Sequence, residues 1–333
     1  MINFILRRVV TSVVLLIIIS VVTFGVFFMV PKLAGTNPAE LYVGKSATPA
    51  DVAATARKLG LDQPIYVQYG RFVKGIFVGR EFASGTNVNH CPAPCFGYSF
   101  RNDRPVWPTL IDRLPVTISL AVGAAVIWLL GGVLAGVISA LRRGSILDRT
   151  MMIIALAGVS LPIYFTGLLA QLWFVHDLHW FKGGEYINFA DDPFGWANKL
   201  FLGWVTLALL YAATYARLTR AQMLETASED YIRTARAKGL RERSVIGKHA
   251  MRSVLTPIVT VFGLDLGQLL GGAILTESVF GLPGIGRLSI DAVSTKDLPV
   301  VLGVTLFGAL FIVIANFLVD IFYAVIDPRV RIS

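Results

Sequence analysis

The sequence predicts an all-α integral membrane protein with six transmembrane helices. Of its 333 residues, 55% are hydrophobic and only 15% are charged, and the mean hydropathy is +0.67. Soluble domains carry about 25% charged residues, so this composition indicates a chain that lies mostly in lipid. Apolar runs long enough to cross the hydrocarbon layer, about 20 residues, recur along the sequence. These runs argue against nucleic-acid binding as the origin of the +9 net charge, and no nucleic-acid partner is expected.

Loops of very different lengths separate the six expected spans. The spans cover residues 9–30, 115–141, 147–175, 200–216, 256–276 and 299–326. A secretory signal peptide is the alternative for the first span, but its apolar region has about 7–15 residues and ends at a small-residue cleavage site. The run here is longer and ends in "MVPKLAG". We therefore expect residues 1–30 to be retained as the first helix and residues 115–326 to form a five-helix core.

Basic residues predict that both termini lie in the cytoplasm. "LRRGSILDR" joins the second and third spans, nine Lys and Arg lie between residues 217 and 252, and the sequence closes with "DPRVRIS". The loop after the third span is acidic and aromatic instead. Because cytoplasmic loops carry the excess of Lys and Arg, we expect an N-in, C-in topology with a cytoplasmic tail at residues 327–333.

A large outer loop, residues 31–114, joins the first two spans. It is too long to be only a connector. "TPADVAATARKLG" predicts a helix that starts at Thr48 and stops at Gly60. The following "PIYVQYGRFVKGIF" is amphipathic and aromatic, which suits a segment at the membrane interface. The loop is therefore expected to be a small extracytoplasmic cap domain.

The two cysteines of the chain, Cys91 and Cys95, lie in the turn "HCPAPC" of this outer loop. Two are too few for a disulfide framework or for a zinc site with four cysteine ligands, and no metal site is expected. An oxidising exterior favours a local disulfide. Two free thiols in a proline-rich turn remain the alternative.

The charged stretch "TASEDYIRTARAKGLRER" predicts a short cytoplasmic helix between the fourth and fifth spans, over residues 227–238. Thr226 and Glu229 have the spacing of a capping box. Gly239 offers the left-handed residue that ends many helices. The following "RERSVIGKHAMRSVLTP" predicts a second helix that feeds the fifth span, so the two form a bent arm. The alternative is a basic loop with no further task.

This arm resembles the cytoplasmic coupling loop of ABC importer permeases. "EDYIRTARAKGL" and the "TPIVT" that enters the fifth span are similar to the dipeptide and oligopeptide (peptide/nickel) variant, in the first of its two permease subunits. The resemblance extends over nearly the whole chain through "RPVWPTLIDRLPVTISLA", "GSILDR", "GVSLPIYFTGLL", "TESVFGLPGIGRL" and "DPRVR". Residues 233–235 and Pro257 depart from the general importer signature in the manner of this variant. The "HCPAPC" turn is not a family feature.

The resemblance implies a permease of the bacterial inner membrane that imports dipeptides or oligopeptides. Nickel chelates, glutathione and haem are the alternative cargoes. The implied partners are a second six-helix permease, two ABC ATPase subunits, an extracytoplasmic substrate-binding protein and membrane lipid. The chain itself would bind no cofactor, because ATP and Mg would be held by the ATPases. The implied ATPase-contacting residues, with Gly239 as the elbow, are Glu229, Tyr231, Arg233, Arg236, Lys238 and Leu240.

No catalytic residues are predicted for this chain. The "GKS" at residues 44–46 matches part of a phosphate-binding loop, but that pattern needs a Gly at position 39, which is Ala39. His176 and His179 flank the second outer loop and are expected at the membrane interface. Asp320, near the inner end of the sixth span, is expected to be a structural hydrogen-bonding residue.

A single strong midplane charge, Asp265, predicts a translocation contact. Charged residues inside a bilayer are rare and usually face a cavity. Gln268 lies three residues on and shares nearly the same helix face. The alternative is that Asp265 pairs with the partner permease. Gly271 and Gly272 are expected to let another helix approach closely.

The Gly- and Pro-rich loop at residues 276–299 completes the outer side. It is expected to be rigid and, with the cap, to form the docking surface for the binding protein. An ion-driven secondary transporter is the alternative of another class, but inverted repeats and paired midplane charges are missing from the sequence pattern. A membrane-anchored structural or assembly factor is a third alternative, but that function would not explain the bent arm or Asp265.

Overall fold

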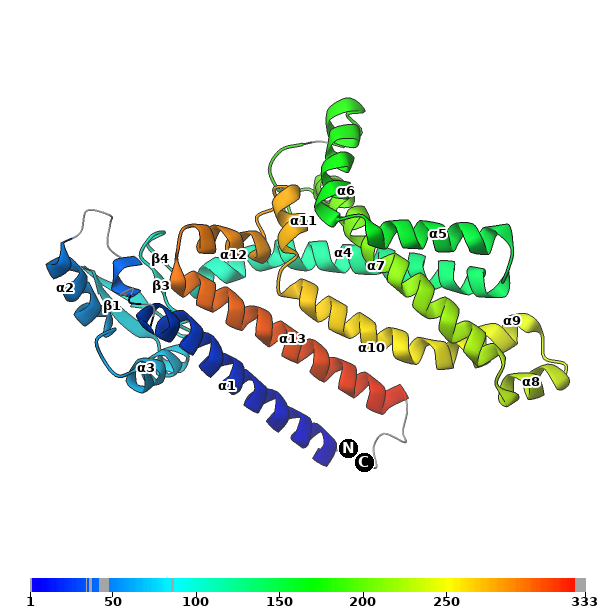
Figure 1. The fold of residues 1–333 in the computed structure, drawn as a ribbon, viewed down its shortest axis with the longest axis horizontal. Coiled ribbons are helices and arrows are strands. Elements are labelled where there is room, and N and C mark those ends of the chain that lie inside the picture. The colour runs from blue at the N-terminus through cyan, green and yellow to red at the C-terminus, as the bar shows by residue number, and fades with distance from the viewer. Residues whose placement is uncertain are drawn as a thin grey trace.

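A computed structural model describes residues 2–33, 35, 38–41, 48–84, 87–181 and 183–326 of the chain. Long helices run side by side, with a small mixed cap at one end and the short helix α8 toward the other (Figure 1). The elements in chain order are α1 (Ile2–Leu33), η1 (Pro38–Leu41), α2 (Pro49–Leu59), α3 (Ile65–Val78), β1 (Arg80–Ser84), β2 (Asn87–Cys91), β3 (Tyr98–Ser99), β4 (Arg104–Pro105), α4 (Val106–Leu141), α5 (Ile146–Ser160), α6 (Ile163–Ala170), η2 (Gln171–Asp177), α7 (Pro193–Ala227), α8 (Asp230–Ala237), α9 (Glu242–Ser244), η3 (Val245–Ala250), α10 (Met251–Leu270), α11 (Ile274–Val279), α12 (Ile285–Ser294) and α13 (Leu298–Ile326).

Five of the described helices are long and apolar enough to cross a membrane, and a bent pair makes a sixth if it is one span. The five cover Ile5–Met29, Val106–Leu141, Pro193–Ala227, Glu242–Leu270 and Leu298–Val319. Several extend beyond the predicted spans. Asp192 caps α7, its side chain accepting a hydrogen bond from the Phe194 N–H at 3.1 Å, and Pro193 occupies the first helical position. The chain is therefore a multi-pass membrane protein.

The third predicted span, residues 147–175, is wrong as one straight helix. The chain bends by 100° between Ser160 and Ile163. Pro162 has no N–H to continue the helix and disfavours helical geometry at Leu161, which adopts an extended conformation. The segment is therefore α5 followed by α6 and the π-helical turn η2, at a steep angle to α5 (Figure 1).

The fifth predicted span, residues 256–276, ends six residues early. α10 stops at Leu270, and Gly272 has a φ of 127° that few other residues adopt. A side chain there would also meet the backbone of Gly286, with a Cβ only 2.8 Å from its Cα. The following loop is compact, because it folds into α11 and α12. The predicted helix feeding this span is confirmed, since Glu242–Leu270 forms one helical segment.

Glycines bring two helix pairs into close contact. On α4, a Cβ at Gly132 or Gly136 would lie 2.8 Å or 2.6 Å from backbone oxygens of α7. On α10, Gly263 and Gly267 pack directly against Val319 and Ala315 of α13. Small residues at four-residue spacing permit such contact between membrane helices. The predicted close approach at Gly271 is confirmed, because Gly308 of α13 lies against it.

The cap corrects the all-α prediction, because it contains strands. The predicted first helix is α2, and Gly60 ends it with a φ of 71°. After α3, β1 pairs antiparallel with β2 in the register Arg80↔Cys91, and β3 pairs with β4. Aromatic contacts of Phe24 on α1 with Tyr69 and Phe72 on α3 attach the cap to the first span.

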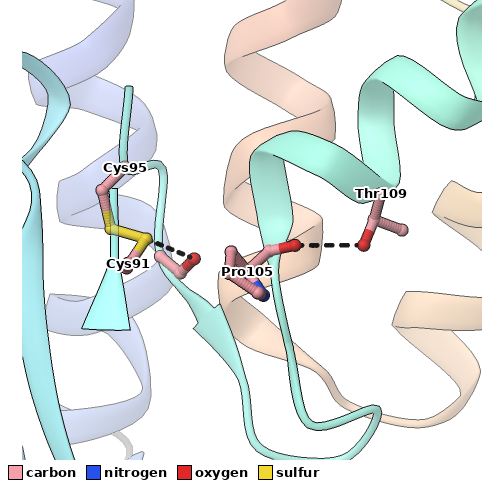
Figure 2. Close-up of a disulfide and its surroundings, with 5 residues drawn as sticks. Cys91, Cys95, Pro105 and Thr109 are labelled. Atoms are coloured by element: carbon pink, nitrogen blue, oxygen red, sulfur yellow. Dashed lines mark hydrogen bonds between the residues drawn. A yellow bond between two sulfur atoms is a disulfide. The ribbon is translucent and has the colours of Figure 1, made fainter. Parts of the chain in front are cut away.

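The disulfide turn is held against the start of α4 (Figure 2). Cys91 and Cys95 are bonded to each other, and the Cys91 sulfur lies 3.5 Å from the Gly97 carbonyl oxygen. The same carbonyl accepts a hydrogen bond from the Val106 N–H at 3.0 Å. In the first turn of α4, the Thr109 hydroxyl donates to the Pro105 carbonyl at 3.1 Å. The turn thus joins the β2 end of the cap to the second span.

A second link ties the cap to the loop before α13. The Ser99 hydroxyl donates a hydrogen bond to the buried carboxylate of Asp297, and Arg101 donates to the Thr295 carbonyl at 2.9 Å. Burial raises the pKa of the Asp297 carboxyl above its ordinary value, although the hydrogen bond from Ser99 acts in the opposite direction.

Asp297→Asn is expected to weaken the pH dependence of stability. Because the folded pKa is raised, the unfolded chain loses this proton first, so stability falls as pH rises from the ordinary carboxyl pKa to the raised one. Asparagine stays neutral and can still accept from Ser99, so the unfolding temperature of this variant should decline less as pH rises above the ordinary carboxyl pKa. The exposed Asp291→Asn is the matched control. Equal pH slopes in Asp297→Asn and the parent protein would contradict the prediction.

Candidate functional site

The predicted cytoplasmic helix is shorter than expected and lacks the predicted capping box. α8 covers Asp230–Ala237 instead of 227–238, with Glu229 as its N-cap and no side-chain cap hydrogen bond. Thr226 is buried inside α7, whose helix continues to Ala227. A residue with helical backbone geometry inside α7 cannot act as an N-cap, which requires an extended backbone. Only two residues therefore separate α7 from α8.

α8 has one buried face and one exposed face. Ile232 is 1% exposed and Ala235 is buried, and both belong to the same apolar cluster as Met223 of α7 and Val245 of η3. Tyr231, in contrast, is 45% exposed. All the residues predicted to contact an ATPase are exposed, namely Glu229, Tyr231, Arg233, Arg236, Lys238 and Leu240. α8 thus has an exposed, mostly charged face, while its apolar side holds it to the two neighbouring helices.

The elbow after α8 has the predicted conformation. Gly239 has a φ of 73°, in the left-handed region. Its N–H donates to the Arg236 carbonyl at 2.9 Å, and the Leu240 N–H donates to the Ala235 carbonyl at 3.3 Å. The Arg236 guanidinium also pairs with Glu242 at 2.7 Å, across the bend. These contacts fix the angle between α8 and the helix that leads into α10.

Asp265 of α10 contacts α7 within the same chain. The Tyr215 hydroxyl donates a hydrogen bond to Asp265 Oδ2 at 2.8 Å. Tyr215 is fully buried, while Asp265 is half-buried and Gln268 is exposed. Trp128 of α4 stacks on Tyr211, one turn before Tyr215. The face of α10 opposite Gly263 and Gly267 therefore joins an aromatic cluster shared by α4 and α7.

The sequence interpretation missed the tyrosine. Tyr211 and Tyr215 lie four residues apart in an apolar span, which is a usable signal because a buried tyrosine hydroxyl usually needs a hydrogen-bond partner. It also missed Glu277 of α11, in the segment between α10 and α13. This fully buried carboxylate accepts hydrogen bonds from the Thr117 hydroxyl at 2.8 Å and the Arg287 N–H at 2.9 Å. Glu277 thereby holds α11 and α12 against α4.

The remaining residues singled out in the sequence do not form a site together in the described part of the chain. His176 and His179 are exposed, at the end of η2 and just beyond it. Residues 44–46 and the side chain of Asp320 lie outside the part of the chain that the structure describes.

Comparisons with known proteins cover nearly the whole chain. Residues 132–332 match the family described as binding-protein-dependent transport system inner membrane component, and residues 1–121 match the N-terminal family of such membrane components. A putative peptide transport system permease protein of Brucella abortus (strain 2308) is 40% identical, with 98% of each chain covered. The dipeptide transport system permease protein DppB of Escherichia coli (strain K12) is 35% identical, with 99% of each covered.

A solved structure shares the fold. A chain of the MetNI methionine ABC transporter, in an inward-facing conformation, superimposes with a TM-score of 0.52 at 18% sequence identity. The match covers 66% of this chain and 97% of that one, so it supports the core architecture. With family matches across both parts of the sequence and relatives above 30% identity over nearly full length, the chain belongs to the binding-protein-dependent transport system inner membrane component family of ABC transporter permeases.

Proposed function

We propose that this chain is the first of two permease subunits in an ATP-driven importer of dipeptides and oligopeptides. The observation that carries the proposal is the full-length similarity to proteins named as peptide and dipeptide permeases, at 34–40% identity over 98–99% of this chain. The exposed face of α8 supports it, because a separate subunit that hydrolyses ATP needs a surface through which to act.

The complete importer would contain a second six-helix permease, two ABC ATPase subunits and an extracytoplasmic substrate-binding protein. ATP and Mg would bind to the ATPases of this inner-membrane complex. The N-in, C-in topology is supported by the basic cytoplasmic loops and by the position of the described chain ends, which lie away from the cap (Figure 1). The cap and the loop at 276–299 would then face outward and receive the binding protein.

α8 would lie in a cleft of one ATPase. Closure of the ATPase dimer would displace α8, and the elbow at Gly239 would pass the movement to α10. Two features support this route: the left-handed φ of Gly239 and the Arg236–Glu242 pair across the bend. With these two features, α8 and the start of α10 would move together as one bent unit.

Asp265 and Gln268 would line part of the translocation pathway, where the carboxylate could receive the amino terminus of a peptide. The half-buried position of Asp265 and the exposure of Gln268 support this assignment. Asp265→Asn is expected to lower peptide uptake about tenfold, the loss typical of a charged hydrogen bond of about 1.5 kcal/mol. Tyr215→Phe, which removes only the intramolecular partner, is the control and should lower uptake less. Unchanged uptake of several peptides by Asp265→Asn would contradict the assignment.

The test of the function is purification of the chain from its native host in mild detergent, followed by transport in proteoliposomes. We expect a second permease and two P-loop ATPases to copurify, and labelled dipeptide to accumulate only with ATP and the binding protein. Recovery of the chain alone, with uptake that needs no ATP but collapses with the proton gradient, would contradict the proposal and favour a secondary transporter.

A further inference from the structure

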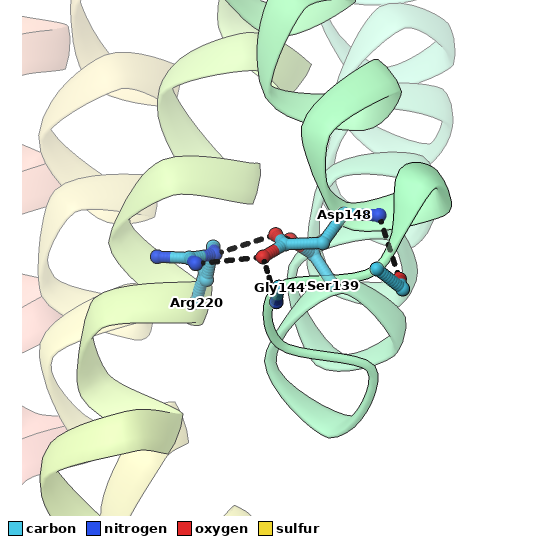
Figure 3. A network of polar contacts seen from close by, with 5 residues as sticks. Ser139, Gly144, Asp148 and Arg220 are labelled. Carbon is cyan, nitrogen blue, oxygen red and sulfur yellow. Dashed lines mark hydrogen bonds and ion pairs between the residues drawn. The ribbon is translucent and has the colours of Figure 1, made fainter.

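Three parts of the chain, namely α4, α7 and the loop before α5, donate hydrogen bonds to one carboxylate at the start of α5 (Figure 3). Arg220 of α7 binds Asp148 through two parallel hydrogen bonds, from Nε to Oδ1 at 2.8 Å and from Nη2 to Oδ2 at 2.9 Å. The Ser139 hydroxyl of α4 also donates to Oδ1, and the Gly144 N–H of the connecting loop donates to Oδ2 at 2.9 Å. Every donor comes from an element other than α5.

The carboxylate at the centre of this network is shielded from solvent, whereas the Arg220 side chain is 26% exposed. Asp148 is 4% exposed and Ser139 is fully buried. A buried ion pair adds little net stability, because desolvation of both charges offsets their attraction. The two-pronged geometry does fix the relative position of the groups, since the planar guanidinium matches the carboxylate at two points. The contribution of this cluster is therefore mainly geometric.

The cluster lies next to the proposed coupling helix. Arg220 precedes the end of α7 at Ala227 by seven residues, about two helical turns, and α8 begins at Asp230. At the same level, a Cβ at Gly136 of α4 would lie 2.6 Å from the Ala216 carbonyl of α7. α7 can therefore neither slide nor rotate against the α4–α5 hairpin without breaking both the ion pair and the glycine contact.

We propose that Arg220 and Asp148 are positioning residues of the coupling step, which carry the displacement of α8 into α4 and α5. This inference rests on the proposed function. The route through Gly239 reaches α10 alone, whereas the Arg220–Asp148 clamp joins the inner ends of α4, α5 and α7 into one unit. ATPase closure would then move both halves of the helical core, because α7 and α10 each connect directly to the arm.

The first test compares transported peptide with hydrolysed ATP in the reconstituted complex. Arg220→Gln and Asp148→Asn are expected to lower the ratio of peptide to ATP about fivefold or more, while ATP hydrolysis continues. Arg220→Lys keeps the positive charge but cannot make two parallel hydrogen bonds to the carboxylate. The ratio of peptide to ATP for this variant should therefore be intermediate. Exchanging the two charges, with Asp148→Arg and Arg220→Asp together, should not restore the ratio. Ser139 and Gly144 also donate hydrogen bonds to position 148 and need an acceptor there. Asp112→Asn, which breaks the exposed Arg104–Asp112 pair of 2.7 Å on the outer side, is the matched control.

A purely structural role predicts something different. Peptide transport and ATP hydrolysis would then fall together, with the ratio unchanged, and this result would overturn the inference. Failure of the proposed function is distinguished by the parent complex, which would then show no ATP-driven peptide uptake at all. If that complex transports another cargo with ATP, the ratio of transported cargo to hydrolysed ATP would still test the role of the Arg220–Asp148 pair.

A second test needs no change in the clamp and remains decisive if the variants fail to assemble. The two cysteines of the chain are bonded to each other, so spin labels can be placed at Arg143→Cys in the hairpin tip and Glu225→Cys at the end of α7. The distance between the labels should change by less than about 3 Å, half a helical turn, between the nucleotide-free and ATP-trapped complexes. A change of a full turn, about 5 Å, in a transporting complex would overturn the inference.

Discussion

Replacing Tyr231 with alanine and Arg233 with glutamate is expected to abolish ATP-driven uptake by releasing the ATPase subunits. Tyr231 is 45% exposed and the Arg233 side chain is 69% exposed, whereas the apolar residues that hold α8 in place face inward. The two changes should therefore leave the fold of the permease intact. Aromatic and arginine residues are the commonest hot spots, so a loss of about 2 kcal/mol or more of binding free energy is expected.

The measurement is the amount of ATPase recovered with the purified permease, together with uptake in proteoliposomes. Arg143→Glu, an equal charge reversal in the exposed α4–α5 loop on the same side of the membrane, is the control. It should retain the ATPases, because the effect depends on the surface of α8 and not on net charge. Full ATPase recovery with the α8 variant would mean that the subunits dock elsewhere.

Gly132→Ala is expected to destabilise the permease by about 1–3 kcal/mol, the usual cost of an extra carbon in a packed core. The new Cβ would lie 2.7 Å from the Cβ of Tyr215 and 2.8 Å from the Ala212 carbonyl oxygen of α7. Neither atom is the end of a flexible side chain, so the helices must separate. Because Tyr215 donates to Asp265, the shift should also disturb the contact between α7 and α10.

The neighbouring Gly131→Ala is the matched control. Gly131 lies on the same helix but has no heavy atom within 4 Å of its would-be Cβ. Both substitutions gain about 1 kcal/mol of helix propensity, so Gly131→Ala should be neutral or stabilising. The measurement is the unfolding midpoint of each variant in detergent. Equal midpoints for the two variants would show that close packing of α4 on α7 does not limit stability.

Local sequence signals determined the elements that depend on their own residues. Apolar runs located five helices that are long enough to cross a membrane, because hydrophobic length is a property of the segment itself. Gly60 was correctly predicted to end a helix and Gly239 to supply a left-handed helix end, because the lack of a Cβ permits positive φ without tertiary help. The resemblance to peptide importers likewise resided in contiguous motifs and was confirmed by the family comparisons.

Some local signals were misread because two of them competed. Thr226 and Glu229 have capping-box spacing, but the helical run of α7 continues through Thr226, and the burial of its side chain supports that outcome. In the third span, the prediction used apolar length and did not consider Pro162, where the chain bends by 100°. The strands of the cap gave too short a pattern to be recognised beside its two helices.

Only the tertiary structure decided which polar groups meet. Asp148 and Arg220 are separated by 72 positions, and Tyr215 and Asp265 by 50. No local periodicity encodes such pairings. They form only when the helices pack, and on α4 it is glycines that allow the close approach to α7. The sequence by itself thus determined a membrane permease with a short charged helix between two of its spans. The packing of its helices decided how that helix is tied to the rest of the chain, since contacts between distant residues exist only after the helices assemble.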